Sequence, residues 1–165
     1  MNNNIDYLPV HMIYEGYDIK FDKKRNFDLI VIKNNLLKIK NKENVINIKY
    51  EQIKKVAISL CSIMDYYTLT QVWFNFHVFV TIYADYNTYY LECENDDVLI
   101  PFLKKLHENN ISIEDVLNIE KIYLDYPEKI SRNKYLEKNM KKISKQFNIK
   151  YPTRVFMGKI NNKFN

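Results

Sequence analysis

From about residue 9 to residue 94, apolar and polar residues alternate with a period of two, which is typical of half-buried β-strands. Polar segments such as Asn34-Asn35 and Asn41–Asn44 interrupt the alternation, and Asn tolerates the left-handed backbone of tight hairpins. We therefore predict strands joined by short turns at about 27–32, 37–39, 45–50, 53–61, 72–83 and 88–94. In the last strand, Glu92 and Glu94 are expected to face outward.

After Asn95 the period changes to that of helices. A first helix is expected at about 97–109, on an apolar stripe formed by Leu99, Phe102, Leu103 and Leu106. Asn95, Asp96 and Asp97 supply capping oxygens for its start, and Pro101 fits only in its first turn. A second helix is expected from Ser112, whose spacing to Asp115 resembles a capping box, to about Tyr123.

The third predicted helix, at about 128–147, is the most amphipathic. Its apolar stripe consists of Leu136, Met140, Ile143 and Phe147, at spacings of four, three and four. The opposite face carries Lys134, Lys138, Lys141 and Lys145. The last 18 residues are expected to pack as an extended segment or to stay loose.

These elements predict an α+β fold, an antiparallel meander of six to seven strands closed by a helix. This arrangement resembles the pleckstrin-homology-like barrel, and is closest to its small bacterial and GRAM-type members. The local likeness lies in the runs Phe27–Ile39 and Ile46–Val56, which together follow the family's strand, turn, strand and entry into the next strand. The resemblance covers about residues 10–110. We therefore expect two parts, a barrel with its closing helix at 1–110 and a helical, basic C-terminal extension at 111–165.

The sequence departs from the eukaryotic branch of that family in two ways. The helix expected at 97–109 has no Trp, and the cluster Lys20, Lys23, Lys24 and Arg25 is only loosely similar to the inositol-phosphate-binding loop. The resemblance therefore does not imply lipid recognition.

The formal net charge of +5 is divided into blocks of alternating sign. Residues 1–19 carry −3, residues 20–55 carry +7, residues 56–128 carry −9 and residues 129–165 carry +10. A surface of one sign attracts ligands of the other sign. However, 22 of the 25 basic residues are Lys, whereas bidentate contacts to phosphates or bases usually use Arg. The basic blocks therefore indicate an anionic partner only weakly.

The residues that could support catalysis or metal binding are few. With only two Gly residues the chain has no Gly-rich phosphate-binding loop, and no His pair has zinc-helix spacing. Cys61, Cys93, His77 and His11 lack short metal-ligand spacing, so we expect packed thiols and a half-buried His77 on its strand. The acid pairs Asp96-Asp97 and Glu114-Asp115 are expected at helix starts. We expect no enzyme activity, no cofactor, no metal and no small-molecule substrate.

The resulting hypothesis is a non-catalytic interaction or assembly module that binds a protein partner or self-associates. By fold analogy, a partner groove is expected between the strand edge near 53–62 and the helix at 97–109. The alternative is a binder of anionic membrane lipid or nucleic acid through Lys20, Lys23, Lys24, Arg25, Lys134, Lys138, Lys141, Lys142 and Lys145. A third option is that the apolar stripe of the basic helix packs on the barrel or on a partner helix while its Lys face is merely solvated. The basic tail could also dock on the acidic region of its own barrel or of a neighbouring copy. Two Cys residues and the lack of a visible secretory signal or membrane-spanning stretch favour a cytoplasmic location.

Overall fold

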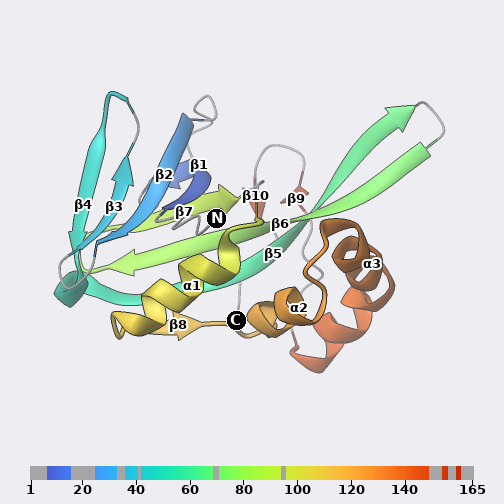
Figure 1. Cartoon of the computed structure of the whole chain (residues 1–165). Coiled ribbons are helices and arrows are strands. Elements are labelled where there is room, and N and C mark those ends of the chain that lie inside the picture. The colour runs from blue at the N-terminus through green and yellow to red at the C-terminus, as the bar shows by residue number, and fades with distance from the viewer. Residues whose placement is uncertain are drawn as a thin grey trace, which may run out of the picture.

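The computed structural model describes residues 7–15, 25–32, 36–40, 42–68, 71–93, 96–148, 154–155 and 159–160, with side chains at 8–10, 28–30, 36–40, 42–62, 75–93 and 96–148. It is an α+β structure with three α-helices among these residues (Figure 1). The elements in chain order are β1 Tyr7–Glu15, β2 Arg25–Ile32, β3 Leu36–Lys40, β4 Val45–Lys49, β5 Ile53–Thr68, β6 Gln71–Ala84, β7 Thr88–Cys93, α1 Leu99–Glu108, β8 Ile113–Glu114, α2 Ile119–Asp125, α3 Lys129–Gln146, β9 Arg154–Val155 and β10 Lys159–Ile160.

Eight of the strands form one sheet in the order β4-β3-β2-β1-β7-β6-β5-β8, and β9 pairs with β10 separately. All pairs are antiparallel except the short parallel pair of β5 with β8. The predicted meander is therefore present, with β1 joining the strands β2–β4 to the strands β5–β7. No pairing among the described residues joins β4 to β8, so the sheet is open there.

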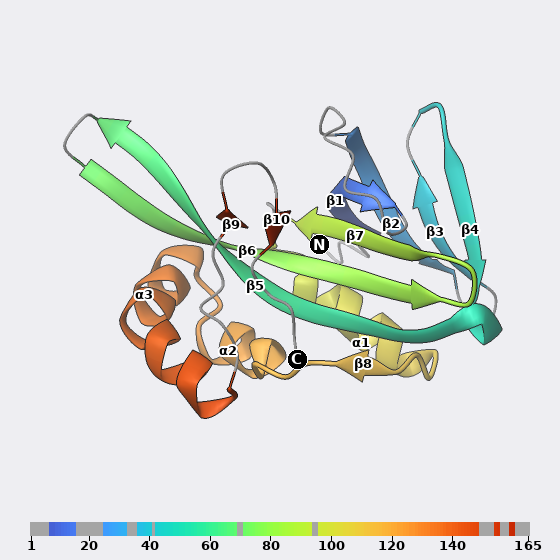
Figure 2. The same ribbon diagram turned by 180° about the vertical axis from the view of Figure 1, so that it is seen from behind.

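The hydrophobic core lies between the sheet and the helices, which cover one face of β5 and β6 (Figures 1 and 2). On β5 and β6 the core residues alternate as predicted, with Val56, Ile58 and Leu60 on one strand and Val78, Val80 and Ile82 on the other. The four apolar residues predicted for α1 are all buried in the same core. Leu136 and Met140 of α3 also belong to it, so residues on both sides of position 110 share one core.

The predicted second helix begins later than expected. Residues Ile113–Glu114 form β8, which pairs with Val56–Ala57 of β5, and α2 begins only at Ile119. The edge of β5 takes up this segment, because the amide of Val56 donates to the carbonyl of Ser112 at 2.8 Å. Asp115 still serves the helix start, since its two carboxylate oxygens accept from the amides of Ile119 and Glu120 at 2.8 and 2.9 Å. Asp115 therefore lies at a helix start, as predicted, but the capping-box prediction at Ser112 is wrong.

Other local expectations have mixed outcomes. Pro101 does lie in the first turn of α1, and Asn110 adopts the left-handed backbone just after that helix. The strand expected at 45–50 ends at Lys49, and Tyr50 begins a 3₁₀ turn instead. Glu92 lies on the face opposite the core residues Leu91 and Cys93, as predicted, but it is 0 % exposed, so this face of β7 is covered rather than open to solvent. Glu94 lies outside the described residues.

Candidate functional site

Helix α3 is the element on which a predicted functional surface can be examined. The apolar stripe predicted for it does face inward, because Leu136 and Met140 are fully buried and Ile143 and Phe147 pack at the core margin. This agrees with the expectation that the apolar stripe packs on the body of the protein. The apolar side of the helix is therefore not available to a membrane or to a partner helix.

A buried polar cluster anchors α3 to the other helices. Arg132 is 2 % exposed, and its Nη2 donates to Asp96 Oδ1 at 2.9 Å. The hydroxyl of Tyr123 donates to the other oxygen of Asp96, and the guanidinium lies 3.9 Å from the centre of the Tyr123 ring. Arg132 Nη1 also donates to the carbonyls of Tyr126 and Pro127, at 3.0 and 2.9 Å. One guanidinium thus connects the segment before α1, helix α2 and the α2–α3 turn.

The cluster corrects two sequence-based expectations. Asp96 was expected to cap α1, but its side chain binds Arg132 and Tyr123, and α1 has no side-chain cap. Arg132 was counted in a basic block, but its charge is buried and paired with Asp96. Burial and the neighbouring carboxylate of Asp96 raise the pKa of Tyr123 well above its usual value, so its hydroxyl keeps its proton and acts as the donor to that carboxylate.

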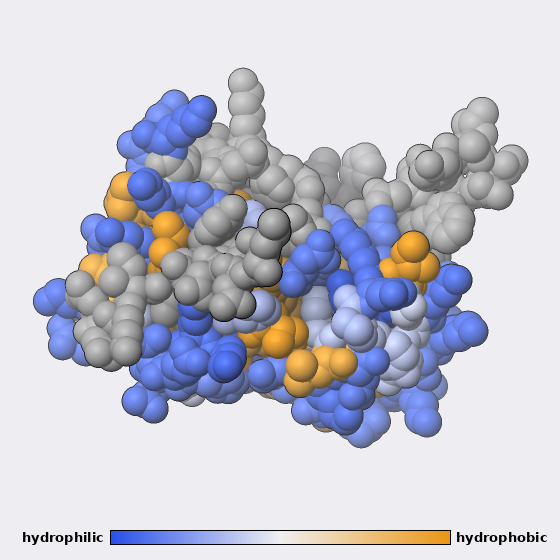
Figure 3. All heavy atoms as spheres, viewed as in Figure 1, coloured by the Kyte–Doolittle hydropathy of each residue, from blue (hydrophilic) through white to orange (hydrophobic). Residues whose placement is uncertain are grey.

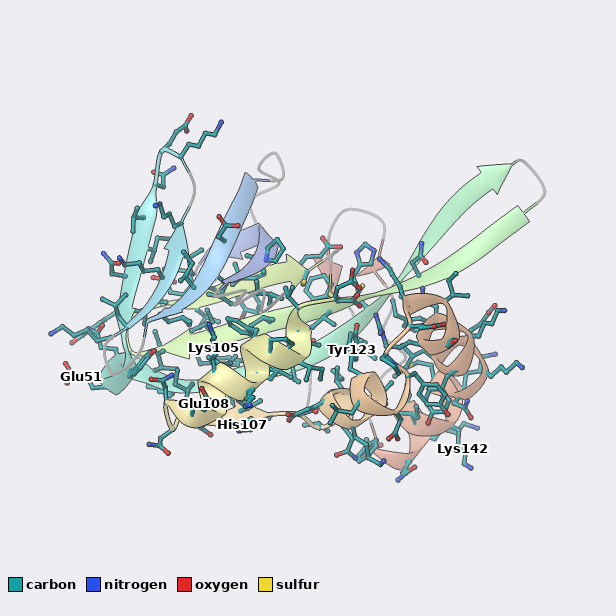
Figure 4. All side chains as sticks on the ribbon, viewed as in Figure 1. Glu51, Lys105, His107, Glu108, Tyr123 and Lys142 are labelled. Carbon is teal, nitrogen blue, oxygen red and sulfur yellow. The ribbon has the colours of Figure 1, made fainter. Side chains whose placement is uncertain are left out.

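The opposite side of α3 presents an exposed basic surface, which we call the lysine face. It consists of Lys134, Lys138, Lys141, Lys142 and Lys145, all exposed. None of the five has an ion-pair partner within the part of the chain that the structure describes. Figure 3 shows mostly hydrophilic residues over this end of the molecule, and Figure 4 shows Lys142 on the outer side of α3, whereas Tyr123 lies inside, near α2. The lysine face is therefore solvated and positioned by a rigid helix.

The acidic block at 56–128 behaves differently, because five of its twelve acidic residues are paired with Lys or Arg within the fold and two more lie beside His. Seven of its twelve acidic residues have a Lys, Arg or His partner within 4.0 Å: Asp85, Glu92, Asp96, Glu108, Glu114, Glu120 and Asp125. Glu114, expected at a helix start, instead pairs with Lys55 between β8 and β5. These pairs reduce the acidic charge that the block offers to the lysine face for docking within the same molecule.

A second polar pair lies on the side of the sheet away from the helices. His77 of β6 is half-buried as predicted, and its Nδ1 lies 2.9 Å from Oε1 of the buried Glu92 of β7. Cys61 of β5 is the direct strand partner of His77, whereas Cys93 belongs to the core on the other face. Among the described side chains, no group of three or more His, Cys, Asp or Glu residues has metal-binding geometry. The structure thus separates the two thiols rather than bringing them together.

The structure does not test the other predicted binding residues, those of the Lys20–Arg25 cluster. Lys20, Lys23 and Lys24 lie outside the described residues, and Arg25 is described only in its backbone, as the first residue of β2. The expected partner groove beside residues 53–62 is partly filled, because β8 occupies the edge of β5 at Val56–Ala57. Within the described residues, no helix is long and apolar enough to cross a membrane.

Sequence reasoning missed the Asp96–Tyr123–Arg132 cluster and the His77–Glu92 pair. A usable signal for the cluster was the position of Arg132, which lies four residues before Leu136 and so on the apolar side of the predicted helix. No family model matches this chain, and neither the curated proteins nor the solved structures contain a match to it.

Proposed function

We propose that this protein is a non-catalytic interaction module that docks on an anionic membrane surface through the lysine face of α3. The single observation that carries the proposal is that five exposed Lys residues lie together, without ion-pair partners among the described residues, on a helix whose other side is anchored in the core. Five of the twelve acidic residues of the middle block are paired with Lys or Arg residues other than those five Lys, which supports an external partner for the charge of α3.

The residue types favour a lipid surface over nucleic acid. Arg132 is the only Arg whose side chain the structure describes, and it is buried, so the exposed bases of α3 are all Lys. Lys acts as a point charge, which suits diffuse attraction to lipid head groups better than bidentate recognition of bases. Ile130, four residues before Lys134 and 71 % exposed, adds an apolar contact at one end of the same face.

The expected affinity is modest. Each Lys near an anionic bilayer contributes about 1 kcal/mol, so five contribute at most about 5 kcal/mol, which corresponds to a binding constant on the order of 10³–10⁴ M⁻¹. Because the Debye length falls from about 10 Å at 0.1 M salt to about 3 Å at 1 M, binding should disappear as salt is added. Reversible, salt-dependent adsorption is therefore expected.

The experiment measures co-sedimentation of the full chain with vesicles of phosphatidylserine and phosphatidylcholine at low salt, with pure phosphatidylcholine vesicles as reference. The variant Lys138→Gln/Lys141→Gln should bind about 30-fold more weakly, since two charges contribute about 2 kcal/mol. The control Lys40→Gln/Lys42→Gln removes the same charge from exposed positions on and after β3 and should bind like the unmodified chain.

Three outcomes would overturn the proposal: no binding to anionic vesicles at low salt, equal binding to neutral vesicles, or equal loss in both double variants. A parallel titration with duplex DNA identifies the other anionic partner. If DNA binds more tightly than the vesicles and depends on Lys138 and Lys141, the membrane assignment is wrong and the lysine face is a nucleic-acid interface.

The pleckstrin-homology-like assignment is likewise a proposal. The strand order β4-β3-β2-β1-β7-β6-β5, followed by a helix packed in the core, supports it, because it matches the expected meander closed by a helix. The lipid binding proposed above does not depend on this resemblance, since it rests on α3, outside the 10–110 segment that the resemblance covers.

A further inference from the structure

Strands β5 and β6 extend well beyond the rest of the sheet. They pair with each other as far as Thr68↔Gln71, whereas β7 pairs with β6 only from Val78 to Tyr83. Figures 1 and 2 both show this two-stranded ribbon projecting away from the body of the molecule, past α3. We call residues 63–68 of β5 and 71–75 of β6 the β5–β6 arm.

The base of the arm is fixed to the body by Asn133 of α3. Its side-chain oxygen accepts from the amide of Phe76 at 3.4 Å, and its side-chain nitrogen donates to Asn75 Oδ1 at 3.1 Å. These contacts meet β6 where its pairing with β7 has ended. Beyond this point, no third described strand pairs with the arm. With respect to the described residues, both of its edges therefore present the backbone groups of an edge strand.

The composition of the arm is unusual for a strand pair at the end of a sheet. The register pairs Met64↔Phe74 and Tyr66↔Val72 share one face of the ribbon, and Ile63 and Trp73 belong to the other face. The arm contains no Lys, Arg, Pro or Gly, and Asp65 is its only charge. Residues 56–103 in fact contain no Lys or Arg, although the chain has 25. Charged residues and Pro are the usual devices that keep strand edges from pairing with other chains, and the arm lacks Lys and Pro entirely.

We propose that the β5–β6 arm is a self-association element, which pairs edge to edge with the arm of a second copy of this chain. An isolated two-stranded ribbon is at best marginally stable in water, so pairing with a further strand would stabilise the arm. A strand edge is self-complementary under a twofold rotation, because an antiparallel copy presents the same repeat of donors and acceptors. With one acidic charge and no basic one, the arm has nothing to attract nucleic acid or an anionic surface.

The fluorescence of a tryptophan within the arm can be used to test this inference. Trp73, the only Trp of the chain, lies in the arm. As the concentration of the full chain is raised through the micromolar range, the emission of Trp73 should shift to shorter wavelength. Over the same range, the mass from sedimentation equilibrium should rise from 20.0 kDa to twice that value. A mass of one chain throughout, or a dimer whose formation leaves the Trp73 emission unchanged, would overturn the inference.

Two matched variants test the site. Val72→Lys places a charge in the arm and should raise the dissociation constant of the dimer by at least about tenfold. Tyr86→Lys introduces the same residue in the exposed turn between β6 and β7 and should leave the dimer unchanged. If Val72→Lys unfolds the chain, the concentration series on the unmodified chain still tests whether the arm associates. Association that survives Val72→Lys in a folded chain would contradict the arm as the interface.

The inference is independent of the lysine face. Vesicle binding by a strictly monomeric chain would refute the arm and leave the proposed membrane docking intact. Dimers that fail to bind vesicles would refute the proposed membrane docking and leave the inference about the arm intact. Arm-dependent binding to neutral vesicles without dimer formation would show that lipid, rather than a second copy, covers the arm, and would also overturn the inference.

Discussion

Replacing Arg132 with Met removes the charge that anchors α3 while keeping a side chain of comparable length. In the native structure the guanidinium bonds to Asp96 and to the carbonyls of Tyr126 and Pro127, and both members of the ion pair are 3 % exposed. The variant leaves the carboxylate of Asp96 buried with the hydroxyl of Tyr123 as its remaining donor from this cluster. The loss of stability in this variant therefore measures the free-energy cost of leaving the Asp96 carboxylate buried without its cationic partner.

The expected loss is large compared with the total stability. Removing one partner of a buried ion pair typically costs about 3–5 kcal/mol, and a domain is stable by only about 5–15 kcal/mol. Replacing all the charged and polar partners by apolar residues of similar size is often nearly neutral, because no buried group is then left without a partner. The triple variant Arg132→Met/Asp96→Leu/Tyr123→Phe should therefore be more stable than Arg132→Met alone.

The assay is urea unfolding at neutral pH, followed by circular dichroism, on the full chain and each variant. The control is Lys134→Met, an exposed substitution two residues further along α3, which should change the free energy of unfolding by less than about 0.5 kcal/mol. The reasoning fails if Arg132→Met lies within about 1 kcal/mol of the unmodified chain, or if the triple variant is no more stable than Arg132→Met.

Substitutions at three further residues, Leu136, Asp115 and Tyr123, test the packing, the helix start and the titration of buried groups. Leu136→Ala should lower the free energy of unfolding by about 2–5 kcal/mol in the same urea assay, because it opens a cavity in the core, whereas Lys138→Ala should be nearly neutral. Asp115→Ala removes two acceptors at the start of α2 and should cost about 1–2 kcal/mol. Burial also raises the pKa of Asp115, so the carboxyl group stays protonated to higher pH in the folded state than in the unfolded chain. The contribution of Asp115 to the free energy of unfolding therefore falls as the pH rises above 3.8, and Asp115→Asn should remove this dependence on pH. The pKa of Tyr123 is also raised, so its contribution to stability is complete below pH 10.0 and is lost as the pH rises above that value. The free energy of unfolding should therefore fall less steeply with pH in Tyr123→Phe than in the unmodified chain between about pH 9 and 11. A loss of less than about 1 kcal/mol for Leu136→Ala, or unchanged pH slopes in Asp115→Asn and Tyr123→Phe, would contradict these assignments.

The elements that the sequence predicts well are those whose burial pattern is complete within one segment. In α1 the residues Leu99, Phe102, Leu103 and Leu106 have helical spacing, and all four are buried. Strands β2, β3 and β6 likewise follow the alternation that predicted them. In each case local periodicity and tertiary packing require the same conformation, so the local pattern is sufficient.

Errors occur where a distant segment decides the outcome. Ser112 has the local spacing of a capping box, but the open edge of β5 binds its carbonyl and extends the next two residues as β8. Glu92 has the alternation of an outward residue, but the face on which it lies is covered, and His77 on the neighbouring strand supplies a partner. Alternation distinguishes the two faces of a strand, but it does not show whether something covers the second face.

The charge blocks illustrate the same limit for function. In the sequence, the −9 block and the +10 block look like complementary surfaces with charges of nearly equal magnitude. In the fold, Arg132 crosses between the blocks to pair with Asp96, and Lys121, Lys104 and His107 pair with acidic residues of their own block. Part of the acidic charge is thus paired with neighbouring residues, whereas the five Lys residues of α3 have no ion-pair partner among the described residues. Because solvated charges that no neighbour balances are the ones that attract an external ligand, the partner of this protein should be sought among anions that meet α3.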